Sequence, residues 1–316
     1  MDTQQIFTRF STMRKDRAVW ESHWQEIAER VLSRQAEFTG ERTPGDKRNT
    51  AMYDATAALA LERFAAAVES LLTPRSAKWH TLRSNNPMIN KDPEVKAYFD
   101  EVENIIFANR NNPKANFASQ MHEGYMSLGA FGTAGTFVDE APVKGVQYRA
   151  IHLADLFVAE NHAGLVDTVY RRFEVSARVA LQMFEDGDLS DELRKCAEEK
   201  PDERIKLLHV VMPRSDRDPQ RSDRKNAAFF SGYYEVKTKQ LIEEGGFDTM
   251  PFIVNRYNSG PRETYGRSPA MTILPDIKML NEMSKTVIRA AQKVVDPPLL
   301  IADEGVIFPI NTNPGA

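Results

Sequence analysis

The chain has 316 residues, of which 41% are hydrophobic and 27% charged, a composition typical of a folded protein with a sizeable core. Acidic residues outnumber basic residues by 45 to 41, which argues against a protein that grips duplex DNA through clustered cations. No apolar run is long enough to span a bilayer, and the first residues lack the pattern of a signal peptide. The single cysteine, Cys196, excludes an internal disulfide and a thiolate metal cage. These features are typical of a protein that is made and folded in the cytosol.

A long helix is the first predicted element. Its apolar residues recur at steps of three and four, with Arg17 at the one skipped place: Ile6, Phe10, Met13, Trp20, Trp24, Ile27 and Val31. This heptad-like seam indicates either a helix packed on its own domain or a seam between subunits, and we favour the first interpretation.

More helices follow, up to a glycine-rich turn. The predicted elements are a polar loop from Thr39 to Asn49, a helix capped by Asn49 or Thr50 that ends at Pro74, a short strand at Trp79–Leu82, a helix that begins at Asp92-Pro93, and a helix from about Asn116 to Leu128. The glycines that follow, between 129 and 135, predict a turn into a strand at Thr136–Val138.

Alternating apolar residues then replace the helical period. They predict strands at 147–152, 165–175, 205–212, 229–236, 240–242 and 251–257, with short helices starting at Ser176 and near Ser190. Because the period changes near Gly132, we expect an α+β fold. Helices should dominate residues 1–130, and a smaller strand-rich region should lie between Gly135 and Tyr257.

A last long helix is predicted from Ser268-Pro269 to Asp296-Pro297-Pro298. Its apolar stripe, a candidate surface for subunit or helix packing, consists of Ile273, Ile277, Leu280, Val287, Ile288, Ala291 and Val295. A basic stripe lies roughly opposite and consists of Lys278, Lys285, Arg289 and Lys293. From spacing alone, the basic stripe is most simply a solvated helix face.

We find no pattern that indicates catalysis, a cofactor or a metal. The spacing of Gly129, Gly132 and Gly135 differs from a dinucleotide fingerprint, and the helix precedes the strand. The pair His122-Glu123 lacks the second histidine of a zinc protease helix, and the histidines are scattered singly. The sequence therefore predicts a protein that is not an enzyme.

Three segments resemble the head-to-tail connecting proteins, or portals, of short-tailed (podovirus-type) phages. The first runs from Tyr53-Asp54-Ala55-Thr56-Ala57 to Leu71-Leu72-Thr73-Pro74-Arg75 and Trp79, with Arg75 where a second proline is common. The second is Gly129-Ala130-Phe131-Gly132-Thr133-Ala134. The third and most specific comprises Arg256-Tyr257, Tyr265-Gly266-Arg267-Ser268-Pro269, Leu274-Pro275-Asp276-Ile277-Lys278, Leu280-Asn281 and Asp296-Pro297-Pro298.

The resemblance implies a portal-like architecture. Residues 1–264 would form a helix-rich wing with a smaller strand-rich region, residues 265–296 a long stem helix, and residues 297–316 the start of a clip. We expect no counterpart here of the rest of the clip, the second stem helix and the crown. The resemblance also implies that the basic stripe of the last helix borders a DNA channel, so this interpretation and the solvated face both stay open.

The implied function is structural. Portal subunits form a homo-oligomeric ring, expected to be a dodecamer, at one capsid vertex. Double-stranded DNA passes through the ring in transit during packaging and ejection and is contacted non-specifically. The implied partners are terminase, the major capsid or scaffolding protein and a tail adaptor, with no membrane and no cofactor. The protein would be assembled in the host cytoplasm and reside in the virion. The alternatives are a cytosolic metal-dependent hydrolase or nuclease, and a capsid-associated adaptor protein.

Overall fold

The α+β architecture predicted from the sequence is confirmed. The computed structural model describes residues 2–40, 45, 52–140, 145–185, 187–218, 220–221 and 223–295. The α-helices in these ranges are α1 (Thr3–Val31), α2 (Thr56–Leu72), α3 (Pro93–Arg110), α4 (Phe117–Phe131), α5 (Ala177–Met183), α6 (Asp191–Glu199) and α7 (Pro269–Val295). The strands are β1 (Thr133–Glu140), β2 (Val146–Ile151), β3 (Leu156–Glu160), β4 (Val166–Ser176), β5 (Arg204–Pro213), β6 (Phe229–Glu235), β7 (Leu241–Phe247) and β8 (Phe252–Arg256). None of the described helices is long and apolar enough to cross a membrane.

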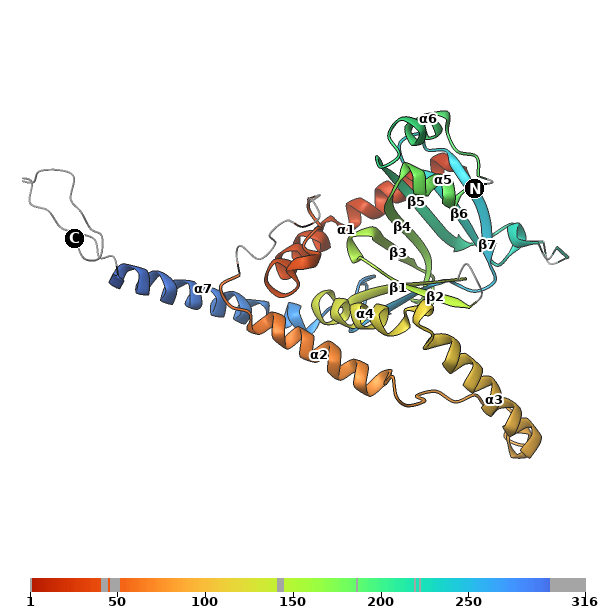
Figure 1. Cartoon of the computed structure of the whole chain (residues 1–316), viewed down its shortest axis with the longest axis horizontal. Helices are drawn as coiled ribbons and strands as arrows, with labels where there is room; N and C mark the ends of the chain where they lie inside the picture. Colours follow the sequence, from red (N-terminus) through yellow and green to blue (C-terminus); the bar gives the residue numbers. More distant parts are fainter. Residues whose placement is uncertain are drawn as a thin grey trace, which may run out of the picture.

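The strands form two antiparallel sheets, in the orders β2-β1-β8 and β3-β4-β5-β6-β7. The larger sheet is a meander in which each strand pairs with its neighbours in sequence. In the smaller sheet β8 returns to pair with β1, so that Phe252 lies opposite Phe137. This pairing brings the chain that leads into α7 back to the end of α4 (Figure 1).

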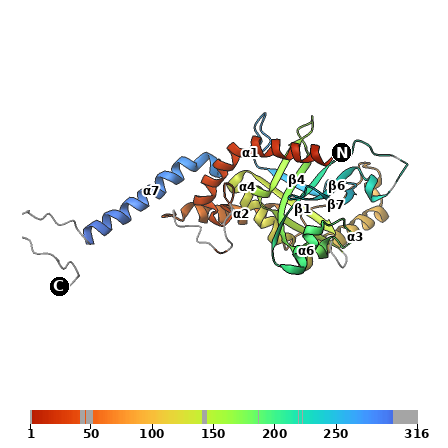
Figure 2. The same cartoon turned by 90° about the horizontal axis from the view of Figure 1, so that it is seen from above.

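Helix α1 packs on its own domain, as the sequence indicated. Trp24, Ile27 and Val31 belong to the main apolar core, which they share with α4 and the smaller sheet. Ile6 and Phe10 lie in a second core against the larger sheet. The helix thus spans two cores along the strand-rich body, as seen from above in Figure 2.

Arg17, the residue at the skipped place of the apolar seam, is almost fully buried. Its Nη1 donates to the carbonyl oxygens of Leu153 (3.0 Å) and Leu156 (2.7 Å), and its Nη2 donates to that of Ala154 (2.7 Å). The guanidinium also pairs with Glu21, one turn along α1. Arg17 therefore ties α1 to the turn that begins β3, a role that the apolar pattern did not reveal.

Three predicted details are wrong. Helix α2 was predicted to follow a cap at Asn49 or Thr50, two residues that lie outside the described ranges, but it begins at Thr56. The amide of Thr56 donates to Asp54 Oδ1 at 2.9 Å. Trp79–Leu82 is not a strand, because the amide of Leu82 donates to the Glu103 side chain of α3 instead of a neighbouring strand. Strand β3 was missed, since it is short and follows the turn at 153–155 directly.

Two helices project from opposite ends of the molecule. Helix α7 extends away from the body at one end and α3 at the other (Figure 1). Helix α3 buries only Glu103. The predicted end of the last helix at Asp296-Pro297-Pro298 and the segment 297–316 lie outside the described residues.

The Arg17 contacts predict a large loss of stability in Arg17→Met. The substitution keeps much of the apolar volume but leaves three buried carbonyl groups without their charged donor, so we expect unfolding in urea to require about 3 kcal/mol less. Arg14→Met is the control, since Arg14 is an exposed arginine of the same helix. We expect it to change stability by less than about 0.5 kcal/mol. Equal stability of the two variants would contradict the assignment.

Candidate functional site at the projecting helix

Parts of the three sequence motifs meet at the base of α7. Residues 53–54 precede α2, residues 129–134 join α4 to β1, and residues 256–281 run from β8 into α7. Backbone and side-chain contacts described below join each of the first two segments to the third. Parts of all three motifs therefore lie where a helix leaves the body, whereas the end of the first motif, from Leu71 to Trp79, lies at the far end of α2.

A close backbone crossing fixes this place. Helix α4 ends at Gly132, whose φ of 76° lies in the left-handed region that favours glycine. The backbone at Gly266 passes directly against it, and a Cβ on either glycine would overlap the carbonyl oxygen of the other. Gly266 N donates to Thr133 Oγ1 (2.8 Å), and Tyr257 N donates to Gly132 O (2.9 Å). The two glycines allow a contact that side chains would prevent.

Ser268 begins α7, as predicted, and also anchors it. Its Oγ accepts from Met271 N at 3.0 Å, which caps the helix, and donates to Ala130 O at 2.7 Å. Pro269 follows at the first helical position, where its missing N–H costs nothing. One hydroxyl thus starts α7 and joins it to the end of α4.

The first turns of α7 are docked in the main core. Ala270, Met271 and Leu274 are buried there, and Ile277 packs against the same cluster. On the helix surface these buried residues lie between the predicted apolar stripe and the predicted basic stripe. Sequence reasoning missed Met271 and Leu274, although the spacing of Met271, Leu274, Lys278 and Asn281 carries the same helical period.

Polar contacts hold the next two turns. Lys278 forms an ion pair with Glu26 of α1. The side-chain oxygen of Asn281 accepts from Tyr53 N at 2.7 Å and from Asp54 N at 3.3 Å. Helix α7 is thereby attached both to α1 and to the segment that precedes α2.

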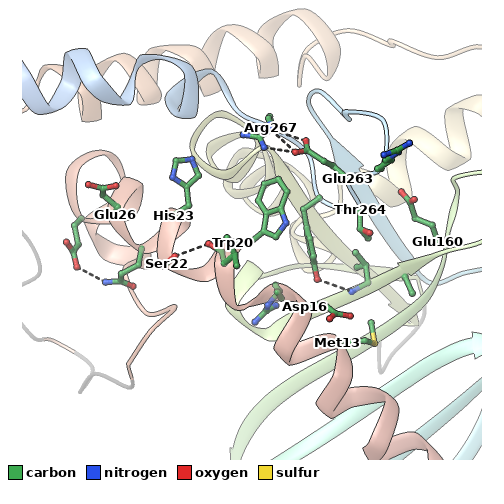
Figure 3. A pocket seen from close by; sticks show the side chains of 18 of the residues that line it. Met13, Asp16, Trp20, Ser22, His23, Glu26, Glu160, Glu263, Thr264 and Arg267 are labelled. Carbon is green, nitrogen blue, oxygen red and sulfur yellow. Dashed lines mark hydrogen bonds and ion pairs between the residues drawn. The ribbon is translucent and has the colours of Figure 1, made fainter.

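A groove of about 1350 Å³ separates α1 from the chain that enters α7. Figure 3 shows Trp20, His23 and Glu26 lining it from α1, and Glu263 paired with Arg267 on the other side. Burial lowers the pKa of His23. The hydrogen bond from Lys278 is the main cause that holds the pKa of Glu26 below its ordinary value, so Glu26 is ionised at neutral pH. Among the described residues, no three His, Cys, Asp or Glu side chains gather to hold a metal ion.

The predicted basic stripe divides into two parts. Lys278 faces α1, and Lys285 pairs with Glu282 and lies 5.7 Å from the ring centre of Tyr53. Arg289 and Lys293 are exposed on the part of α7 that has left the body. From 283 to 295 the sequence contains no acidic residue, so this part of the helix is uniformly positive.

The predicted apolar stripe is largely exposed in the single chain. Ile277 is half-buried, whereas Ile273, Leu280, Val287, Ile288, Ala291 and Val295 are exposed, Val295 to 84%. Sequence reasoning missed three further exposed apolar residues, Met279, Met283 and Val294, which widen the stripe. Contiguous apolar surface of this kind marks a binding face rather than ordinary surface.

The glycine crossing predicts that Gly266→Ala is destabilising. Gly266 has an ordinary φ, so the methyl group tests the close approach alone, without backbone strain. We expect a loss of about 1–3 kcal/mol in chemical unfolding, because the added methyl must displace backbone rather than a flexible side chain. Gly40→Ala is the matched control, since a Cβ there meets nothing within 4 Å. A Gly266→Ala protein as stable as the control would show that the crossing imposes no constraint.

Comparison with known proteins shows the family of the chain. The family described as "Bacteriophage head to tail connecting protein" matches residues 3–316. The chain is 28% identical over 317 residues to the "Probable portal protein" of Bordetella phage BPP-1, covering 98% of this chain and 56% of that protein. It is 25% identical over 304 residues to the "Portal protein" of Salmonella phage epsilon15, covering 95% of this chain and 54% of that protein. It thus spans about half the length of these curated relatives. The chain belongs to the family of bacteriophage head to tail connecting proteins.

Proposed function

We propose that this chain is the wing and first stem helix of a portal subunit, which forms a ring at one capsid vertex and conducts DNA during packaging and ejection. The proposal rests on how α7 is attached and on which of its side chains are exposed. The helix is anchored at one end by the glycine crossing and the Ser268 cap, and it leaves the body with a broad apolar face and two exposed basic side chains, Arg289 and Lys293. A helix of this kind needs partners along its length.

The physical demands of a conduit agree with these two faces. A ring of identical subunits needs extended apolar contacts between neighbours, which the exposed stripe from Ile273 to Val295 can supply. DNA must slide through, so a weak field is better suited than a tight grip. The bases from Lys278 to Lys293 offer such a field without base readout, in a chain whose net charge is −4.

We propose the following division of the chain. Residues 1–264 form the wing, residues 265–296 the stem helix, and residues 297–316 the start of the clip. The first turns of α7 support a firm join between wing and stem, because Ala270, Met271 and Leu274 are buried in the wing core.

The proposed partners follow from the same role. They are other copies of the subunit in a dodecameric ring, terminase, the major capsid or scaffolding protein, and a tail adaptor, with double-stranded DNA in transit. The protein would be assembled in the host cytoplasm and remain in the virion. We propose a structural role without catalytic turnover.

The basic stripe is tested by replacing Lys278, Lys285, Arg289 and Lys293 with Gln in the full-length natural protein. We expect the ring to assemble normally, as seen by negative-stain microscopy, because the apolar face is untouched. DNA packaging or retention should change, because the field along α7 is altered. Lys278→Gln alone shows how much of the change comes from losing the ion pair with Glu26. The control replaces four exposed bases of the body, Arg14, Lys15, Lys96 and Lys195, with Gln and changes the net charge equally.

Two outcomes would contradict this account. If the α7 variant packages and retains DNA like the parent, the stripe is a solvated face and does not border the channel. Leu280→Asp places a charge on the apolar face and should reduce ring formation, because packing would bury an unpaired carboxylate. Normal rings with Asp at this position would show that the apolar face is not a subunit contact.

A further inference from the structure

A proline interrupts the hydrogen bonding of α7 close to the body. Pro275 lies inside the helix, where its nitrogen cannot donate to the carbonyl of Met271, four residues earlier. A missing bond of this kind makes the helix locally easier to bend. The interruption falls one residue after Leu274, the last fully buried residue of the docked segment.

The contacts on the two sides of Pro275 differ in kind. Before it, Ala270, Met271 and Leu274 are buried in the apolar core, so movement would expose packed surface. After it, Ile277 still contacts the core but is only half-buried, and the Lys278–Glu26 pair is partly exposed, with 45% and 35% of the two side chains accessible to solvent. Water competes well for such contacts, so they can break and re-form without disturbing the core.

The part of α7 after Pro275, residues 276–295, is called the shaft below. Polar contacts attach it to the body at two separate places. Lys278 reaches α1, whereas Asn281 accepts from the backbone of Tyr53 and Asp54, ahead of α2. Two attachments to different elements define the direction of a rod, which a single attachment cannot do. One turn further, Lys285 lies 5.7 Å from the ring centre of Tyr53, and from Thr286 to Val295 every residue is exposed.

We infer that Pro275 is a hinge between the body and the shaft of α7, and that Lys278 and Asn281 are positioning residues that set the direction of the shaft. The docked segment before Pro275 is the fixed part, and residues 276–295 are the moving part. This explains why the motif from Leu274 to Asn281 combines a proline, a lysine and an asparagine. The inference concerns this chain alone and does not rest on the proposed ring.

The hinge can be tested by measuring a distance distribution between two spin labels in the 316-residue chain. Cys196→Ser removes the native thiol, and Gln292→Cys and Arg178→Cys place labels on the exposed shaft and on α5 of the body. Four proteins are compared on this background. They are the parent, Lys278→Gln with Asn281→Leu, the same pair with Pro275→Ala, and Lys293→Gln as a control at an exposed base.

We expect one narrow distribution for the parent and for Lys293→Gln. Loss of both attachments should broaden the distribution at least about twofold, and Pro275→Ala should narrow it again, because alanine restores the missing helical hydrogen bond. A broad distribution that persists with Pro275→Ala would place the bending elsewhere, and no broadening on loss of the attachments would show that they do not set the direction. Lys278→Arg keeps the ion pair and should retain the narrow distribution, and thermal unfolding of each variant confirms that the body stays folded.

Discussion

The close approach of two backbones at Gly132 and Gly266 is the constraint on which the rest of the structure depends. It lets the chain that returns from β8 pass under the end of α4, where Ser268 can bond to Ala130 and start α7. A side chain on either glycine would push the segments apart and move the base of α7 out of the core. A few residues at the start of α7, called its root below, therefore set the direction of a helix of 27 residues.

The two ends of α7 are stabilised in different ways. The root is held by buried apolar side chains and by the Ser268 hydrogen bonds, which suits a permanent join. The shaft is held by the polar contacts of Lys278 and Asn281 and by the approach of Lys285 to Tyr53, and from Thr286 on it is exposed, although it carries a broad apolar face. Such a face costs free energy in water until it is covered, which is why we propose that neighbouring subunits contact it. This asymmetry fits the proposed role as a subunit of a ring.

Much of the fold could be predicted from the sequence because local signals coincide with the element boundaries. The caps Asp92, Ser190 and Ser268 mark helix starts that the structure confirms, and the glycine turn at Gly132 marks the change from helices to strands. Signals that depend on distant partners were not readable. Arg17 interrupts an apolar seam, and only the carbonyl groups of residues 153–156, far along the chain, explain its burial. The burial of Met271 and Leu274 was also not predicted, because the apolar and basic stripes are the more obvious patterns on the same helix.

The central claim is that the exposed faces of α7 are completed by other copies of the subunit around a DNA channel. Cryo-electron microscopy of the assembled full-length protein tests it most directly, because it shows what covers each face of this helix. The account predicts a closed ring in which the apolar stripe from Ile273 to Val295 is buried against neighbouring helices, with Arg289 and Lys293 turned toward the central channel. A ring in which this apolar stripe remains exposed to solvent, or in which α7 points away from the axis, would contradict it.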